Sequence, residues 1–178
     1  LIDIFEKRIL DRSNHLKLFF DNDWNCSYDI VSYGHDIEAS WLLPESALVL
    51  AEEESLTKVE SRLPSVVAAA TEGFTPEGGM IYEKMGDHID GDRHWWVQAE
   101  AAVGYFNLWE HFGAHEGLEN AIHCWEYIKK ELVDQKNGEW FWSVRADGSI
   151  NRVEDKAGFW KCPYHNGRMC LEIIERVK

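Results

Sequence analysis

The stretch RHWWVQAEAAVGYFNLWEHFGAHEGLENAIHCWEYIKKELV, residues 93–133, predicts a pair of neighbouring helices. We expect the first helix over Arg93–Phe112 and the second over Glu116–Val133. The turn Gly113-Ala114-His115 between them is short enough to make the two helices antiparallel neighbours. This part of the chain therefore favours a fold made of helix pairs.

Further helices are expected on both sides of this pair. Each shows helical apolar spacing or a helix-start signal, and they cover Leu1–Arg12, Gly34–Glu54, Leu56–Thr71 and Pro163–Val177. Pro44 should kink its helix or mark a late start, and Pro64 interrupts the next one, because proline removes a backbone donor. The chain is thus expected to contain six helices.

Short strands are expected in the aromatic and glycine-rich connections between these helices. The candidate segments are Leu16–Phe20, Gly78–Tyr82 and Glu139–Val144. The dipeptides Asn137-Gly138 and Asp147-Gly148 are turn signals.

Helix pairs joined by long aromatic loops are typical of an α/α toroid, in which inner helices line a cavity and outer helices surround them. Six helices would form half of a twelve-helix ring, as a single domain over residues 1–178. Half a ring exposes apolar surface on its inner helices. The chain is therefore expected to be part of a longer protein, with Leu1 as a cut edge, or to pair with a partner such as a second copy of itself.

Charge and cysteine content narrow the class of protein. The formal net charge of −14 argues against binding to nucleic acids, to anionic membranes or to phosphorylated substrates, because like charges repel. No apolar run is long enough to span a bilayer, and no signal peptide is apparent. The four cysteines form no C-x-x-C pair, which favours reduced thiols and a cytoplasmic protein.

Aromatic residues are abundant, with nine Trp, eight Phe and six Tyr. Aromatic clefts suit sugars, because the apolar face of a pyranose packs on a ring. The alternative is a helical core that happens to be rich in tryptophan.

Three segments bring together residues with useful chemistry. In SYGHDIEASW, residues 32–41, His35 and Glu38 share a helix face with Trp41 beside them, an arrangement suited to acid–base work. In WWVQAE, residues 95–100, Trp96 lies one turn below Glu100. Each segment also has a purely structural interpretation. In residues 32–41, a histidine and acidic residues are simply favoured at the start of a helix. In residues 95–100, the tryptophan could belong to the core and the glutamate could be solvated.

The third segment is FWKCPYHNGR, residues 159–168. His165 and Arg168 lie in the first turns of the last helix, where free backbone N–H groups favour negative charge. The structural alternative is an ordinary loop-to-helix junction.

Together, the strings SYGHDIE, WWVQAE and PYHNGR resemble signature segments of the N-acylglucosamine/cellobiose 2-epimerase family, in the same order and separation. The resemblance extends over essentially all 178 residues, and the Tyr-Gly-His-Asp and Tyr-His-Asn-Gly-Arg variants are closest to cellobiose 2-epimerases. It implies the C-terminal half of an (α/α)6 barrel and an isomerase that inverts C2 of a reducing sugar. This chemistry needs no redox cofactor and no metal.

The resemblance also implies roles for the residues. His35 and His165 would be the acid–base pair, with His165 assigned to the C2 proton and His35 to the partner transfer, or the reverse. Glu38 would orient His35 or bind a hydroxyl, and Arg168 would stabilise the enediolate oxygen. The remaining expected substrate-binding residues are Trp41, Trp96, Glu100 and Trp160.

Several alternatives remain open at this point. The same barrel would suit an N-acylglucosamine 2-epimerase, an aldose–ketose isomerase or a non-catalytic sugar-binding half barrel, and the isolated chain is expected to be a poor catalyst. A glycoside hydrolase would need two suitably placed carboxylates. No metal site is expected, because His111 and His115 lack the glutamate of an H-E-x-x-H motif.

Overall fold

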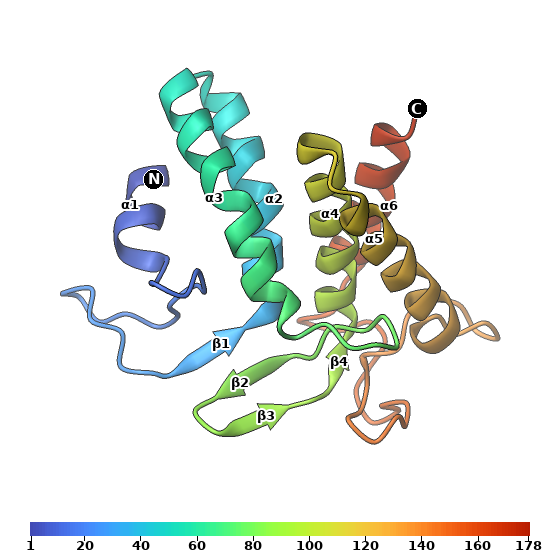
Figure 1. Ribbon diagram of the computed structural model, residues 1–178. Helices are drawn as coiled ribbons and strands as arrows, with labels where there is room; N and C mark the ends of the chain where they lie inside the picture. Colours follow the sequence, from blue (N-terminus) through green and yellow to red (C-terminus); the bar gives the residue numbers. More distant parts are fainter.

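The computed structural model describes all residues, 1–178, and its long helices pack in pairs (Figure 1). The first pair is α2 (Tyr33–Leu50) and α3 (Glu53–Thr71), and the second is α4 (Trp95–Phe112) and α5 (His115–Tyr127). α6 (Tyr164–Arg176) follows as a single helix. Left-handed residues end the first helix of each pair, Ala51 with φ 56° and Gly113 with φ 64°, so the chain reverses at once.

α4 is the central helix of the molecule. It packs against α2 on one side and α6 on the other, while α3 and α5 pack behind α2 and α4. Its residues are buried almost without interruption from Trp95 to Leu108. α2, α4 and α6 therefore form an inner row, with their N-terminal ends at the same end of the molecule (Figure 1).

Glycines allow α2 and α4 to approach closely. A Cβ atom on Gly104 would lie 2.6 Å from Cγ1 of Ile37, and one on Gly34 would lie 2.5 Å from the Trp96 ring. No side chain other than hydrogen fits such gaps without movement of the neighbour. The close contact places the start of α2 directly against Trp96.

The strands lie at the N-terminal ends of the inner helices. β1 (Ile30–Ser32), β2 (Glu83–Met85) and β3 (His88–Asp90) form an antiparallel sheet in that order. β4 (Arg93–His94) pairs with β5 (Ser143–Val144). β1 leads directly into α2 and β4 into α4, so the strands fix where these two helices begin.

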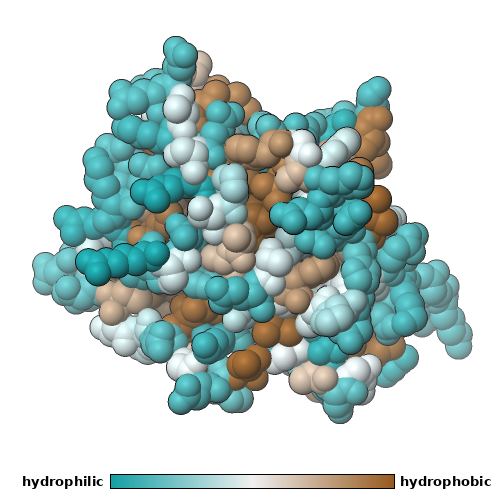
Figure 2. Space-filling model, in the orientation of Figure 1, coloured by the Kyte–Doolittle hydropathy of each residue, from teal (hydrophilic) through white to brown (hydrophobic).

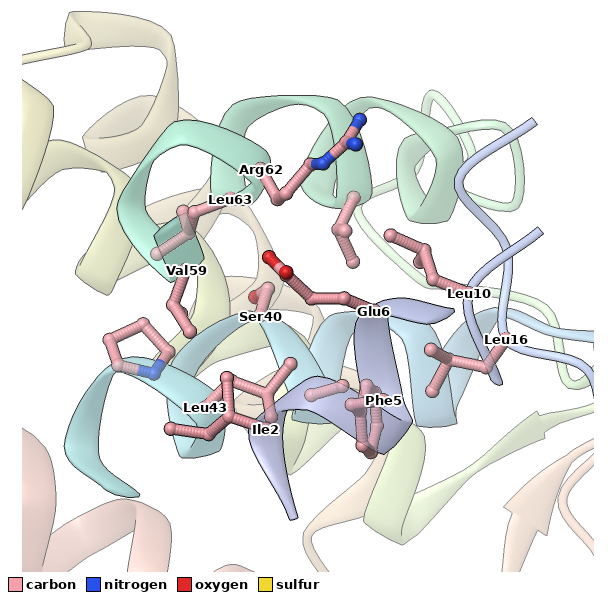
Figure 3. A pocket seen from close by; sticks show the side chains of 13 residues that line it. Ile2, Phe5, Glu6, Leu10, Leu16, Ser40, Leu43, Val59, Arg62 and Leu63 are labelled. Carbon is pink, nitrogen blue, oxygen red and sulfur yellow. The ribbon is translucent and has the colours of Figure 1, made fainter. Parts of the chain in front are cut away.

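The N-terminal segment packs on the first helix pair. It contains a short α1 (Ile2–Ile4) and a π-helical turn, η1 (Phe5–Ile9). Figure 3 shows the apolar side chains of this segment facing α2 and α3 across a small pocket, lined among others by Ile2, Phe5, Leu43, Val59 and Leu63.

The prediction of strands was only partly correct. Leu16–Phe20 is not a strand, since only its two end residues make isolated bridges. Gly78–Tyr82 is not one either, and pairs only at Met80, because the hairpin forms further along as β2 and β3. In Glu139–Val144 only the last two residues form a strand. The turns at Asn137-Gly138 and Asp147-Gly148 are confirmed, with φ of 74° at Gly138 and 85° at Gly148.

Helix positions were predicted well and helix ends less well. The fourth predicted helix starts at Trp95, because Arg93-His94 forms β4 instead. The helix over Leu1–Arg12 ends at Ile9, and the predicted fifth helix finishes as a π-helical turn, η2 (Ile128–Leu132). α2 and α3 continue through their prolines, so the late start suggested for Pro44 is wrong. No helix combines the length and apolar character that a membrane crossing requires.

Candidate active site

The first turns of the three inner helices carry a compact cluster of polar and aromatic side chains. Because the helices are parallel, their N-terminal ends, which bear partial positive charge, converge on the same place. The members of the cluster are His35 and Glu38 from α2, Trp96 and Glu100 from α4, and His165 and Arg168 from α6.

Glu100 lies at the centre of the cluster and is 1% exposed. Its Oε1 atom is 2.6 Å from Nδ1 of His165, and its Oε2 accepts a hydrogen bond of 2.9 Å from the indole N–H of Trp41. An ionised carboxylate only accepts hydrogen bonds, so Nδ1 of His165 carries the proton. Nε2 of His165 is thereby left as the nitrogen that can exchange a proton with a ligand.

Arg168 connects the two carboxylates of the cluster. Its Nη2 donates to Oε1 of Glu38 and to Oε1 of Glu100, both at 2.7 Å. The guanidinium lies between two aromatic rings, 4.8 Å from the ring centroid of Trp41 and 4.5 Å from that of Tyr164, whose hydroxyl it also contacts. The Nε of Arg168 is buried and has no partner. The contacts on both sides of the guanidinium hold the side chain in place.

His35 faces the same space from α2. Its Nδ1 is 2.7 Å from the hydroxyl oxygen of Ser32, which fixes the orientation of the ring. Its ring lies 4.9 Å from that of Trp96, and Trp96 lies 5.5 Å from His165. Burial lowers the pKa of His35, with a further contribution from His165 nearby, so the imidazole is neutral near pH 7.

Two carboxylates of the cluster lie beside one guanidinium, that of Arg168. Burial, together with the nearby Glu100, raises the pKa of Glu38. Glu38, Glu100 and His165 have ligand atoms within 4.8 Å of one another, a spacing that a metal ion could use. Arg168, however, already provides the counter-charge to both carboxylates.

The structure brings together all but one of the residues selected from the sequence. Trp160 is the exception, since it is 79% exposed and its ring packs edge-on against Phe159. The partners also differ from expectation in one case. Glu38 contacts Arg168, whereas the expected orientation of His35 comes from Ser32.

Two residues that contact the cluster, Ser32 and Tyr164, were not predicted from the sequence. Ser32 precedes His35 by three positions, and Tyr164 precedes Arg168 by four, so both pairs have the spacing of helix neighbours. This spacing was the available signal. Asp36, the neighbour of His35 in the sequence, lies outside the cluster and instead binds His15 and the backbone N–H of Leu16.

Helix pairs arranged as an inner row and an outer layer, with a histidine–carboxylate cluster at the N-terminal ends of the inner helices, define an α/α-barrel protein. Residues 1–167 match the family model described as N-acylglucosamine 2-epimerase (GlcNAc 2-epimerase). The chain belongs to this family.

Curated relatives and solved structures agree with this assignment. The chain is 59% identical over 177 residues to a cellobiose 2-epimerase from Bacteroides fragilis, covering 98% of this chain and 45% of the relative. A crystal structure of a sugar epimerase from a ruminal bacterium superposes with a TM-score of 0.94 at 37% identity, covering 98% of this chain and 46% of that one. The cellobiose 2-epimerase of Spirochaeta thermophila DSM 6192 gives 0.91 at 39% identity, with 99% and 44% covered.

These similarities confirm the predicted fold class, a predominantly helical α/α-barrel architecture with few short strands. The chain spans about half the length of the curated relatives it matches. The description of residues 1–178 as one domain stays a prediction.

Proposed function

We propose that this chain supplies the half of a sugar 2-epimerase that carries His35 and His165, and that the enzyme acts at the reducing end of a cellobiose-type disaccharide. The observation that carries the proposal is the placement of two imidazoles, His35 and His165, next to the same indole, that of Trp96, with ring centroids 4.9 and 5.5 Å away. Relatives named cellobiose 2-epimerase, at 59% and 41% identity, support the choice of reaction.

The proposed reaction is proton transfer at C2. Once the sugar ring is open, the C2 proton lies next to an aldehyde and is acidic enough for a histidine base to remove it. Nε2 of His165 takes this proton in the proposal, because Glu100 holds Nδ1. His35, once it has taken a proton from solvent, gives that proton to the opposite face of the enediolate, which inverts C2. His165 then releases the proton taken from C2 to solvent. The two histidines exchange roles in the reverse reaction.

The other members of the cluster would act on charge and position. Arg168 would place positive charge beside the enediolate oxygen. Trp41 and Trp96 would hold the reacting sugar, and Trp160 would meet the second sugar ring from its exposed position. Glu38 and Glu100 would bind hydroxyls in addition to fixing Arg168 and His165.

The proposed enzyme includes a complementary half that covers the apolar faces of α5 and α6. The relatives are about twice as long as this chain, and a site open to water on one side would stabilise an enediolate poorly. Cytoplasmic location is also proposed, because all four cysteines are free and Cys162 and Cys170 are exposed.

Proton NMR in D₂O with cellobiose tests the proposal. The chain would be measured alone and after co-expression with the N-terminal part of the Bacteroides fragilis relative that it does not cover. We expect the reconstituted assembly to exchange the C2 proton and to produce a mannose reducing end, and the chain alone to do so slowly or not at all.

The products separate the alternatives. A ketose product would indicate an aldose–ketose isomerase, and activity restricted to N-acylglucosamine would indicate the other epimerase. A stable reconstituted assembly that exchanges no C2 proton would contradict the proposal. If neither the unaltered protein nor His165→Ala turns over sugar, and both bind it with similar affinity, the chain would be part of a sugar-binding module.

A further inference from the structure

Lys161 is a charged residue buried beside the cluster but outside it. It is 1% exposed, and its ammonium group donates to Oε1 of Glu139 at 3.1 Å and to the carbonyl oxygens of Trp140 and Lys156, both at 2.7 Å. An ammonium group has three protons, so every donor is used. Burying a charge is costly unless it is fully paired, which makes this a specific polar site.

Glu139 extends this site to the start of α6. The same Oε1 atom accepts a hydrogen bond of 2.9 Å from Nδ2 of Asn166, the residue that follows His165. Glu139 has φ 62°, a left-handed conformation that favours glycine. A residue in this conformation persists where its surroundings hold it firmly, and here its carboxylate binds both Lys161 and Asn166.

Lys161 also contacts the start of α4. Its ammonium lies 5.4 Å from the ring centroid of Trp95, the residue before Trp96. The connection between β5 and α6 carries Trp160 next to Lys161, and α6 begins at Tyr164, just before His165. Three segments distant in sequence thus meet at Lys161: the turn at 137–140, the connection before α6, and the first turn of α4.

We propose that Lys161, Glu139 and Asn166, here called the polar triad, are positioning residues that set the place of His165 and of Trp160 for the reaction. The assignment of a reaction rests on the proposed function. None of the three contacts the cluster through its charged or amide group, so they act through the backbone at the start of α6. Their effect is to keep Nδ1 of His165 at 2.6 Å from Glu100.

The sharpest test is the double variant Lys161→Met/Glu139→Gly. It removes both charges together, so no unpaired charge remains buried, and glycine suits the left-handed backbone at position 139. The variant still leaves the carbonyl oxygens of Trp140 and Lys156 and the amide of Asn166 without these partners, so a second, milder variant is needed beside it. Asn166→Leu is the second variant, since it breaks only the link to α6 and keeps the Lys161–Glu139 pair. Lys129→Met, which removes an exposed pair with Glu126, is the control.

The first readout needs no catalysis. In the unaltered chain, the Nδ1 proton of His165 should give a downfield NMR signal, assigned by its absence in His165→Gln. We expect this signal to shift and broaden in the double variant and in Asn166→Leu, and to stay unchanged in the control. In the reconstituted assembly we expect kcat to fall about 10- to 100-fold, the size expected of a misplaced group, with KM changed by less than about threefold.

The two proposals fail in different ways. If the reconstituted assembly shows no epimerase activity, the proposed function is wrong. A changed NMR signal of His165 in the triad variants would still support the positioning role. An unchanged signal and unchanged kcat in both triad variants would overturn that role. If the double variant does not fold, the NMR signal of His165 and the kcat of Asn166→Leu alone test the positioning role.

Discussion

Glu100 receives hydrogen bonds from three other helix-borne groups, and its charge is therefore the first feature to test at the residue scale. Glu100→Gln keeps the size of the side chain but removes the negative charge that faces His165 and Arg168. We expect the rate of C2 proton exchange in the reconstituted assembly to fall by about 100-fold or more, as for loss of acid–base assistance.

Glu110→Gln is the matched control for this prediction. Glu110 lies on the same helix, α4, but at its other end, where it pairs with Arg176 at 3.1 Å. The exchange rate should stay within about twofold of the unaltered protein, because partly exposed ion pairs contribute little. Equal losses in the two variants would mean that the effect is general destabilisation of α4.

The buried His15 should make the stability of the folded chain depend on pH. Its Nδ1 is 2.7 Å from Oδ2 of Asp36, and its Nε2 is 3.6 Å from Glu72. The hydrogen bond to Asp36 raises the pKa of His15. The folded protein therefore holds the proton of His15 more tightly than the unfolded chain does. The stabilisation is complete below the unfolded pKa of about 6.5 and is lost as pH rises through the raised folded pKa.

His15→Gln should accordingly lower the free energy of unfolding by about 1.5–3 kcal/mol at pH 6, the range for a hydrogen bond to a charged group. The difference from the unaltered chain should shrink by about pH 9. Urea unfolding at both pH values measures it. His115→Gln, which removes an exposed histidine 3.8 Å from Glu119, should show no such pH dependence. A difference for His15→Gln that grows with pH would contradict the assignment.

At the scale of elements, the spacing of α2 and α4 depends on glycine. Gly104→Ala would place Cβ 2.6 Å from Cγ1 of Ile37 and 2.9 Å from its carbonyl oxygen. We expect a loss of about 1–3 kcal/mol in the free energy of unfolding, as for other overpacked positions. Gly167→Ala is the control, since it lies in α6 with no atom within 4 Å of the added Cβ. Alanine there should raise stability by about 0.5–1 kcal/mol, and thermal unfolding compares the two.

The helices could be predicted from the sequence, whereas the strands mostly could not, and the reason is physical. Helical spacing of apolar residues is local, so α2 to α6 were found. The strand at Arg93-His94 exists because it pairs with Ser143-Val144, about fifty positions away, and no local pattern encodes that pairing. The same limit applies to the site. His35 and Glu38 were correctly placed on one face, but the partner of Glu38 is Arg168 on another helix.

At the scale of the whole molecule, an uncovered apolar groove lies between α5 and α6. Its volume is about 420 Å³, and every lining residue is hydrophobic, among them Ile122, Trp125, Ile174 and Val177. Figure 2 shows apolar surface along the edge of the molecule over α6. Exposed apolar surface of this kind favours association, because contact removes it from water. The sequence predicted exposed apolar surface on the inner helices, whereas this groove lies between the outer helix α5 and the inner helix α6.

We therefore expect the isolated chain to self-associate through this groove. Sedimentation velocity over a range of concentrations should show dimers or larger species, and Ile174→Glu should weaken association by about tenfold or more, since a charge in an apolar contact is costly. Val153→Glu, which changes an exposed residue in a loop away from the groove, should have no effect. The same Ile174→Glu change should reduce recovery of the assembly with the N-terminal half, because both contacts use one surface. A chain that stays monomeric, and that assembles normally when Ile174 is Glu, would show that the groove is not an interface.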